Sequence, residues 1–150
     1  MRVAEIMTRE VQTVPPEMSA AEAWDLMRRR QIHHLVVTAG SEVMGVLSDR
    51  DAGGRRGAIV RARSRVADLM TTAVVTAAPD MTVRKIANLM RGRTIGCVPV
   101  TDRERLVGIV TTSDLLELLG RGIDRPARPP RRALHYRAPH KRRKGAFGVW

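Results

Sequence analysis

The sequence predicts an α/β (α+β) fold made of two tandem units of similar structure, followed by a basic tail. Three observations predict it. The body of the chain repeats itself at a fixed offset, each copy alternates between helical and strand-like patterns, and the positive charge is concentrated after residue 120. With 150 residues and 43% hydrophobic content, the chain is long enough for a pair of small units that share a core.

The repeat emerges when the chain is aligned with itself. At an offset of 63, residues 3–51 align with residues 66–114 without a gap, and 17 of the 49 positions are identical. "VAEIMT" returns as "VADLMT", and "LMRRRQI" returns as "LMRGRTI". We therefore expect one repeat over residues 1–62, a second over 63–120, and a tail over 121–150.

Each repeat begins with a short extended segment, "VQTV" or "VVTA", and a helix follows. Ser19 and Thr82 stand in N-cap positions, where a hydroxyl accepts a hydrogen bond from the first helical turn. The runs "AAEAWDLMRRR" (20–30) and "VRKIANLMRGR" (83–93) have the apolar spacing of a helix with one buried face.

Two strands follow each of these helices. "HLVVT" and "VMGVLS" in the first repeat, and "CVPVT" and "LVGIVT" in the second, are rich in β-branched residues and are separated by polar turns. "SDLLELLG" predicts a closing helix that ends at Gly120. The equivalent stretch after Asp51 contains three glycines, so we expect a shorter helix there.

This pattern resembles a tandem pair of CBS domains, the cystathionine β-synthase type of regulatory module that is also called a Bateman module. The resemblance rests on M-T, a helix, a small sheet and G-h-h-[ST]-x-x-D (h, hydrophobic), present twice at identical spacing over about residues 3–120. It implies two βαββα repeats packed with pseudo-two-fold symmetry. It also implies a homodimer and two clefts for a regulatory adenosyl ligand: AMP, ADP, ATP, S-adenosylmethionine or a dinucleotide such as NAD.

In the family, each cleft combines the G-h-h-[ST]-x-x-D end of one repeat with the start of a strand from the other. The resemblance gives the Asp51 cleft Val46, Ser48, Asp51, Ile95, Gly96 and Cys97, and it gives the Asp114 cleft Ile109, Thr111, Asp114, Ile32, His33 and His34. A carboxylate at the start of a helix suits the two hydroxyls of a ribose. The neighbouring hydroxyls suit a phosphate or the ribose at a helix N-terminus, and the aliphatic residues suit a purine.

Each of these residues also has a purely structural interpretation. An aspartate in the first turn of a helix ordinarily interacts with the helix dipole, and a lone cysteine such as Cys97 is ordinarily a small buried hydrophobe. In the structural interpretation, His33 and His34 are surface or strand-end residues without a ligand contact. If they contact ligand, the imidazoles make the Asp114 cleft the better site for a phosphorylated nucleotide, with a pH dependence.

The sequence favours a binding module over an enzyme. It contains no common catalytic motif, no phosphate-binding glycine loop and no cysteine-histidine metal spacing, so no cofactor is expected to be required. The charged start of the chain and the lack of a long apolar run predict a cytoplasmic protein without membrane contact, and the single cysteine fits a reducing compartment.

The net charge of +12 is unevenly distributed. Residues 121–150 contain ten Lys or Arg and one Asp, a net charge of +9 that leaves +3 for residues 1–120. The tail also contains Tyr136, Phe147 and Trp150. Rings interleaved with basic residues suit nucleic acid or another polyanion, while a solvated extension and docking of the rings on a partner are alternatives.

Three classes of function therefore remain open. The first is a nucleotide sensor that signals to an effector protein. The second is a polyanion binder that uses the tail on a dimeric scaffold. The third is a CBS pair that holds no ligand and serves only for assembly.

Overall fold

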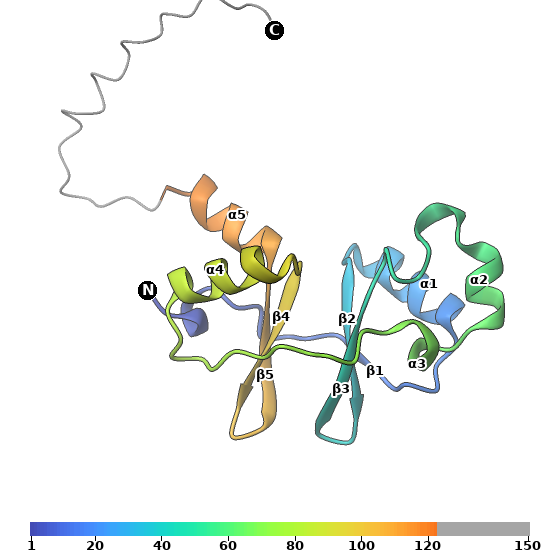
Figure 1. The fold of residues 1–150 in the computed structure, drawn as a ribbon. Helices are drawn as coiled ribbons and strands as arrows, with labels where there is room; N and C mark the ends of the chain where they lie inside the picture. The colour runs from blue at the N-terminus through green and yellow to red at the C-terminus, as the bar shows by residue number, and fades with distance from the viewer. Residues whose placement is uncertain (123–150) are drawn as a thin grey trace, which may run out of the picture. The chain divides into compact units, whose positions relative to one another are not determined.

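The computed structural model describes residues 1–122, which contain two small β-sheets with helices beside them (Figure 1). The tail beyond residue 122, and the nucleic-acid hypothesis that depends on it, lie outside the described residues. The first half of the described chain contains η1 (Val3–Glu5), β1 (Thr13–Val14), α1 (Ala20–Arg30), β2 (His34–Ala39), β3 (Glu42–Ser48), η2 (Gly54–Arg56) and α2 (Ala58–Arg63). The second half contains α3 (Val66–Leu69), α4 (Val83–Arg93), β4 (Cys97–Asp102), β5 (Arg105–Thr111) and α5 (Thr112–Gly120).

The two long helices α1 and α4 have the bounds that the apolar spacing predicts. Ser19 Oγ accepts a hydrogen bond from the Glu22 N–H at 3.1 Å, and Thr82 Oγ1 accepts one from the Lys85 N–H at 3.2 Å. Both predicted N-caps are therefore confirmed. The helices also end alike, since the C-cap residue after each has a left-handed backbone, with φ 54° in the first repeat and 55° in the second.

The sheets repeat the same pairing. β2 and β3 are antiparallel with His34 opposite Ser48, and β4 and β5 are antiparallel with Cys97 opposite Thr111. β1 adds a short parallel strand beside β2, whereas the second repeat has only one bridge, Ala77 with Val100, in that place. The predicted extended segments thus form a strand in the first repeat and a single bridge in the second.

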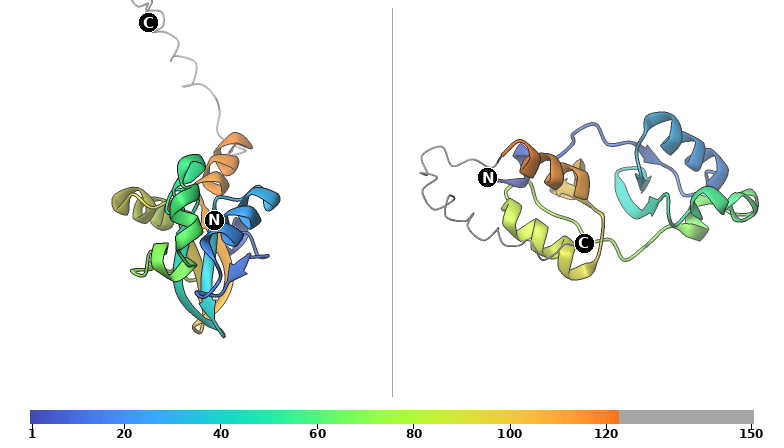
Figure 2. Two further views of the ribbon diagram at one scale, coloured as in Figure 1. Left: turned by 90° about the vertical axis from the view of Figure 1, so that its right-hand side faces the viewer. Right: turned by 90° about the horizontal axis from the view of Figure 1, so that it is seen from above.

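The first segment of each repeat packs into the core of the other repeat (Figures 1 and 2). The Val3 N–H donates to the Met81 carbonyl at 2.8 Å, and the Val66 N–H donates to the Met18 carbonyl at the same distance. η1 therefore lies against α4, and α3 lies against α1. The offset of 63 relates the residues in these two hydrogen bonds. The two repeats therefore exchange their first segments, η1 and α3, in a way that follows the pseudo-two-fold symmetry. The boundary between residues 62 and 63 separates the two sequence repeats, but each core contains residues from both sides of it.

Each half has its own buried cluster, and a third cluster lies between the sheets. In the first core, Val66 packs with Met27, Leu35 and Leu47; in the second, Val3 packs with Ile86, Val98 and Val110. The third cluster is formed by Val36, Cys97 and Ile109, with Val11, Val43, Val46 and Leu106 against it. Cys97 is 7% exposed, so the prediction of a small buried hydrophobe is confirmed.

The helix after Asp51 is shorter than its counterpart, as the glycines predict. α2 has six residues and begins only at Ala58, whereas α5 has nine and follows directly after β5. The left-handed backbones of Gly53 (φ 87°) and Gly54 (φ 60°) interrupt any helix that starts at Asp51. A short 3-10 turn, η2, fills the interval.

Candidate functional site

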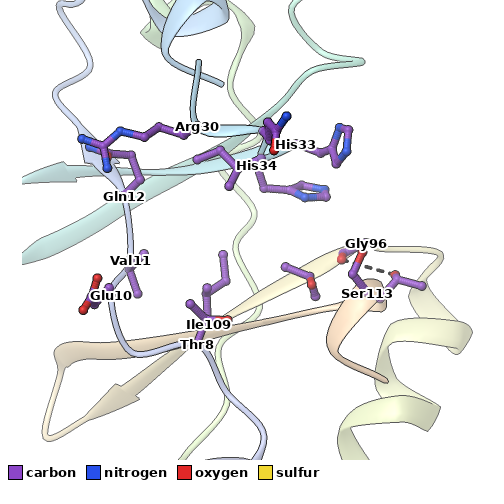
Figure 3. A pocket seen from close by; sticks show the side chains of 14 residues that line it. Thr8, Glu10, Val11, Gln12, Arg30, His33, His34, Gly96, Ile109 and Ser113 are labelled. Atoms are coloured by element: carbon purple, nitrogen blue, oxygen red, sulfur yellow. Dashed lines mark hydrogen bonds between the residues drawn. The ribbon is translucent and has the colours of Figure 1, made fainter. Parts of the chain in front are cut away.

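Two cavities lie where the ends of β3 and β5 approach the starts of β4 and β2. The cavity at the end of β3 has a volume of about 610 Å³, and the cavity at the end of β5 has a volume of about 470 Å³ (Figure 3). Both volumes lie within the range of roughly 300–1,000 Å³ that is usual for small-molecule sites. We keep the names Asp51 cleft and Asp114 cleft for these two cavities.

The structure brings the predicted residues together in the predicted combinations. The Asp51 cleft is lined by all six of its expected residues, Val46, Ser48, Asp51, Ile95, Gly96 and Cys97. The Asp114 cleft is lined by five of its six, Ile32, His33, His34, Ile109 and Thr111. Asp114 itself is absent from this lining. The pairing of segments follows the family pattern, and ligand binding by these residues stays a prediction.

Both aspartates are engaged in capping the turn that follows their strand. Asp114 Oδ2 accepts hydrogen bonds from the Thr111 N–H at 2.7 Å and from the Thr111 hydroxyl at 3.0 Å. Asp51 Oδ2 accepts one from the Ser48 N–H at 3.0 Å, and Ser48 Oγ accepts one from the Asp51 N–H at 2.9 Å. This is the reciprocal geometry of a capping box. Each carboxylate therefore has a structural role through Oδ2, and its Oδ1 takes no part in the cap.

Two extended segments complete the clefts, and they were not among the predicted site residues. Thr8 and the stretch 10–12 line the Asp114 cleft, while Thr71 and the stretch 73–75 line the Asp51 cleft. They lie there because Thr8 exchanges two hydrogen bonds of 2.9 Å with Ile109, and Thr71 exchanges bonds of 2.9 and 3.0 Å with Val46. The repeated M-T motif marks both threonines, but the pattern alone does not say which sheet edge each segment joins.

Charged side chains of both signs line each cleft. The Asp114 cleft is lined by the basic residues Arg30 and His33 and by Glu10, and the Asp51 cleft is lined by Arg50 and Arg91 and by Asp49 and Asp51. His34 lines both. The preference of phosphorylated ligands for the Asp114 cleft was expected because its imidazoles supplied the basic group. Basic side chains line both clefts, and this preference stays a prediction.

Burial is the largest influence on the pKa of two side chains that line the clefts, His34 and Cys97. It lowers the pKa of His34, against the opposing influence of the Asp49 carboxylate, so the imidazole is mainly neutral at pH 7. Burial, helped by the nearby Asp51 carboxylate, raises the pKa of the Cys97 thiol to about 12. A protonated buried thiol is a poor nucleophile, so Cys97 contributes apolar surface. His33 is more exposed and lies with Nδ1 at 2.9 Å from Asp49 Oδ2.

A buried arginine holds the loop that follows Asp51. Arg61 is 7% exposed, and its guanidinium lies 4.1 Å from the centre of the Trp24 ring. Its Nη1 donates to the Ala52 carbonyl at 2.8 Å and to the Gly54 carbonyl at 2.5 Å. The glycine-rich loop is therefore tied to α1 through α2, and the Asp51 cap is maintained although the helix is interrupted.

Two further structural observations concern residues 1–122. No group of three or more His, Cys, Asp or Glu side chains in this part is placed to hold a metal ion. Among its helices, none has the length and apolar character needed to cross a membrane.

The relatives of this chain have the same two repeats. The family model for the CBS domain matches residues 3–52 and 66–121. The CBS domain-containing protein YhcV of Bacillus subtilis is 33% identical over 114 residues, which cover 75% of this chain and 81% of YhcV. Homoserine O-acetyltransferase of Methanohalobium evestigatum is 31% identical over 78% of this chain, but the chain spans only 24% of that enzyme. Because the chain matches so small a part of the enzyme, this similarity does not assign the enzyme's activity to the chain.

Solved structures agree with the fold. The CBS domain pair of protein MJ0100, in complex with 5′-methylthioadenosine and S-adenosyl-L-methionine, matches with a TM-score of 0.73 and 29% identity over 80% of this chain and 96% of that one. The CBS-domain containing protein ATU1752 from Agrobacterium tumefaciens matches with a TM-score of 0.71 and 29% identity over 79% and 99%. The cytosolic domain of the Mg²⁺ channel MgtE in complex with ATP matches at 0.63 and 32% over 75% and 46%. The chain belongs to the CBS domain family and contains a tandem pair of CBS domains.

Proposed function

We propose that this chain is a regulatory module that senses an adenosyl ligand in the clefts between its two CBS repeats. The observation that carries the proposal is that each cleft is assembled from both repeats, with a strand end and capping box from one and a strand start from the other. A ligand in either cleft therefore contacts both repeats at once. The ligand class is supported by two similar structures, one in complex with 5′-methylthioadenosine and S-adenosyl-L-methionine and one in complex with ATP.

In this proposal the residues of each cleft have separate tasks. The aliphatic side chains of Val46 and Ile109 cover the purine. The free Oδ1 of Asp51 accepts from ribose hydroxyls, and Asp114 Oδ1, which has one long contact of 3.4 Å from Thr8 Oγ1, is the corresponding acceptor. The arginines and His34 meet an anionic group. All these tasks are binding tasks, so the proposal includes no catalytic step.

Regulation requires that the ligand favour one arrangement over another. Because a ligand contacts both repeats, its binding stabilises one arrangement of the two repeats relative to each other and one position of α5. We propose that this change is passed to a second copy of the chain in a cytoplasmic homodimer, and from there to a separate effector protein. Apolar side chains on α5 and α2 are available for the second copy: Leu116 and Leu119 are each 61% exposed, and Ile59 is 72% exposed.

A thermal-shift screen against AMP, ADP, ATP, S-adenosylmethionine and NADH tests the proposal. A ligand at 100 times its Kd stabilises a fold by about 2.7 kcal/mol, which is a shift of several degrees for a small domain. We expect such a shift in the parent protein and a smaller one in Asp51→Asn or Asp114→Asn. If none of the five ligands moves the midpoint of the parent, the sensing proposal is contradicted and a ligand-free scaffold is favoured.

A matched control separates binding from capping. Asp68 Oδ2 accepts a hydrogen bond from the Arg65 N–H at 2.8 Å and so caps α3, but Asp68 lines neither cleft. Asp68→Asn is expected to lower the midpoint of the free protein without changing the ligand-induced shift. The same result for Asp51→Asn and Asp114→Asn would reduce both aspartates to structural residues.

A second candidate function rests on the tail. Residues 121–150 hold +9 of the net charge of +12, which suits a nucleic acid or another polyanion. Binding of single-stranded DNA that falls steeply with added salt, and that disappears on truncation after Gly120, would favour this function. Binding that is unchanged by the truncation would contradict it.

A further inference from the structure

One titratable side chain belongs to both clefts. His34 lies at the start of β2 and lines the Asp51 cleft as well as the Asp114 cleft, and Gly96, from the other repeat, does the same. Figure 3 places His34 across the Asp114 cleft from Thr8 and Ile109. A Cβ on Gly96 would come within 3.1 Å of His34 Nε2, so the glycine leaves room for the imidazole between the two cavities.

The pseudo-symmetry makes this position unusual. At the offset of 63, the counterpart of His34 is Cys97, which lines the Asp51 cleft but not the Asp114 cleft. The shared wall therefore has one imidazole, and its counterpart is a thiol that stays protonated. A ligand that reaches this wall from either cleft therefore meets the same side chain, the imidazole of His34.

The protonation state of His34 decides which hydrogen bonds its imidazole can make. A neutral imidazole has one N–H donor and one acceptor nitrogen, while an imidazolium has two donors. The charged and titratable groups that act on His34 are the neighbouring His33 and the carboxylates of Asp49 and Asp51 in the loop after β3. Burial is the largest effect and lowers the pKa of His34, the charge of His33 lowers it further, and the Asp49 and Asp51 carboxylates oppose them.

We propose that His34 is a ligand contact shared by the two clefts, and that it must be protonated to serve an anionic ligand in both clefts at once. The inference rests on the proposed function and narrows the ligand to a phosphorylated adenosyl compound. A neutral His34 donates to a phosphate in one cleft only. The imidazolium donates to a phosphate in each, so the proton couples the two sites.

The direction of the pH effect follows from linkage. A phosphate beside the imidazole stabilises its charged form, so the pKa of His34 is higher in the complex than in the free protein. The contribution of His34 to binding is then complete at a pH below the pKa of the free protein, and it is lost as the pH rises through the pKa of the complex. Between those two values, binding takes up a proton.

Isothermal titration with AMP tests this. The parent protein, His34→Gln and the control Asp68→Asn, at a residue that lines neither cleft, are titrated at pH 6.5, 7.2 and 8.0, each in two buffers with different enthalpies of ionisation. The phosphate of AMP has its own pKa near 6, so the quantity of interest is the difference between the parent and His34→Gln. We expect proton uptake in the parent and in Asp68→Asn but not in His34→Gln. Over this range the affinity should fall more in the parent than in the variant, by up to about tenfold if binding raises the pKa of His34 by one unit.

Sharing is tested by repeating the substitution with one cleft weakened. His34→Gln should reduce AMP affinity in both the Asp51→Asn and the Asp114→Asn backgrounds, because His34 serves the cleft that remains. A reduction in only one background means that His34 contacts one cleft and overturns the inference. Equal proton uptake in the parent and His34→Gln also overturns it, while AMP binding in the parent would still support the proposed function. No AMP binding in the parent overturns this inference, and the proposed function then depends on the other four ligands of the thermal-shift screen.

Discussion

At the scale of single residues, two glycines explain why short motifs far apart in the sequence occur together. A Cβ on Gly108 would lie 2.5 Å from Met7 Sδ and 3.1 Å from the Thr8 carbonyl oxygen. A Cβ on Gly45 would lie 2.8 Å from both Met70 Sδ and the Thr71 carbonyl oxygen. The glycine of each G-h-h-[ST]-x-x-D motif is thus packed against the M-T motif of the other repeat. The methionine side chains can shift, but the backbones of Thr8 and Thr71 are hydrogen-bonded to the strands and cannot move away as easily.

We therefore expect Gly108→Ala to destabilise the protein by about 1–3 kcal/mol, the usual cost of an overpacked core. The free energy of unfolding in urea measures it. Gly92 provides the control, because it lies in α4 and a Cβ there meets nothing within 4 Å. Gly92→Ala should stabilise the protein by about 0.5–1 kcal/mol through helix propensity. Equal effects of the two substitutions would contradict the close approach.

Arg61 gives a second prediction at this scale. Arg61→Met removes the donor to the Ala52 and Gly54 carbonyls and the contact with Trp24, which should cost about 2 kcal/mol. Because this arginine holds the loop after Asp51, ligand affinity should fall in the Asp51 cleft and stay unchanged in the Asp114 cleft.

Fluorescence of Trp24 and ligand titration provide the readouts for Arg61. Arg63→Met is the control, because Arg63 lies on the same helix but is exposed. A stability loss of equal size in Arg63→Met would show that the contact between Arg61 and Trp24 is unimportant. Loss of affinity in both clefts would show that Arg61 acts on the whole fold.

At the scale of elements, local chemistry was predictable and long-range pairing was not. The ranges of α1 and α4 and their caps follow from local spacing and from one hydroxyl each. The short α2 follows from three glycines. The exchange of η1 and α3 does not follow, since "VAEIMT" and "VADLMT" are nearly identical and carry no mark of which core each one joins. For the same reason Thr8 and Thr71 could not be assigned to a cleft, and the role of His34 in both clefts could not be foreseen.

The exchange predicts unusual sensitivity near the N-terminus. Val3 is fully buried in the second core, although residues this close to a terminus are ordinarily tolerant of change. Val3→Ala and Val66→Ala should each cost about 2 kcal/mol, because equivalent contacts are lost in the two cores. Thermal unfolding measures the effect, and Val60→Ala, at a position 46% exposed, is the control. A Val3 variant as stable as the control would contradict the packing of η1.

At the scale of the whole molecule, the proposed homodimer depends on an exposed apolar helix face. Leu116 and Leu119 are three residues apart on α5, so they lie on one side of the helix. Replacing both by Glu should prevent association with a second copy, because two buried charges would have no partner. Sedimentation equilibrium measures the mass. The control is Met44→Glu on β3, at a residue 36% exposed. A mass unchanged by the double substitution would place the interface elsewhere.

The exchange of first segments also sets an order for the synthesis of the chain. The first core needs Val66 and Thr71, so it can close soon after these residues leave the ribosome. Val3 is translated before all of its partners in the second core, which include Val110, and Thr8 pairs with Ile109. These contacts span more than a hundred positions, which slows their formation. The apolar segment around Val3 therefore cannot complete its contacts until most of the described chain has been translated, and it is among the last parts of that chain to fold.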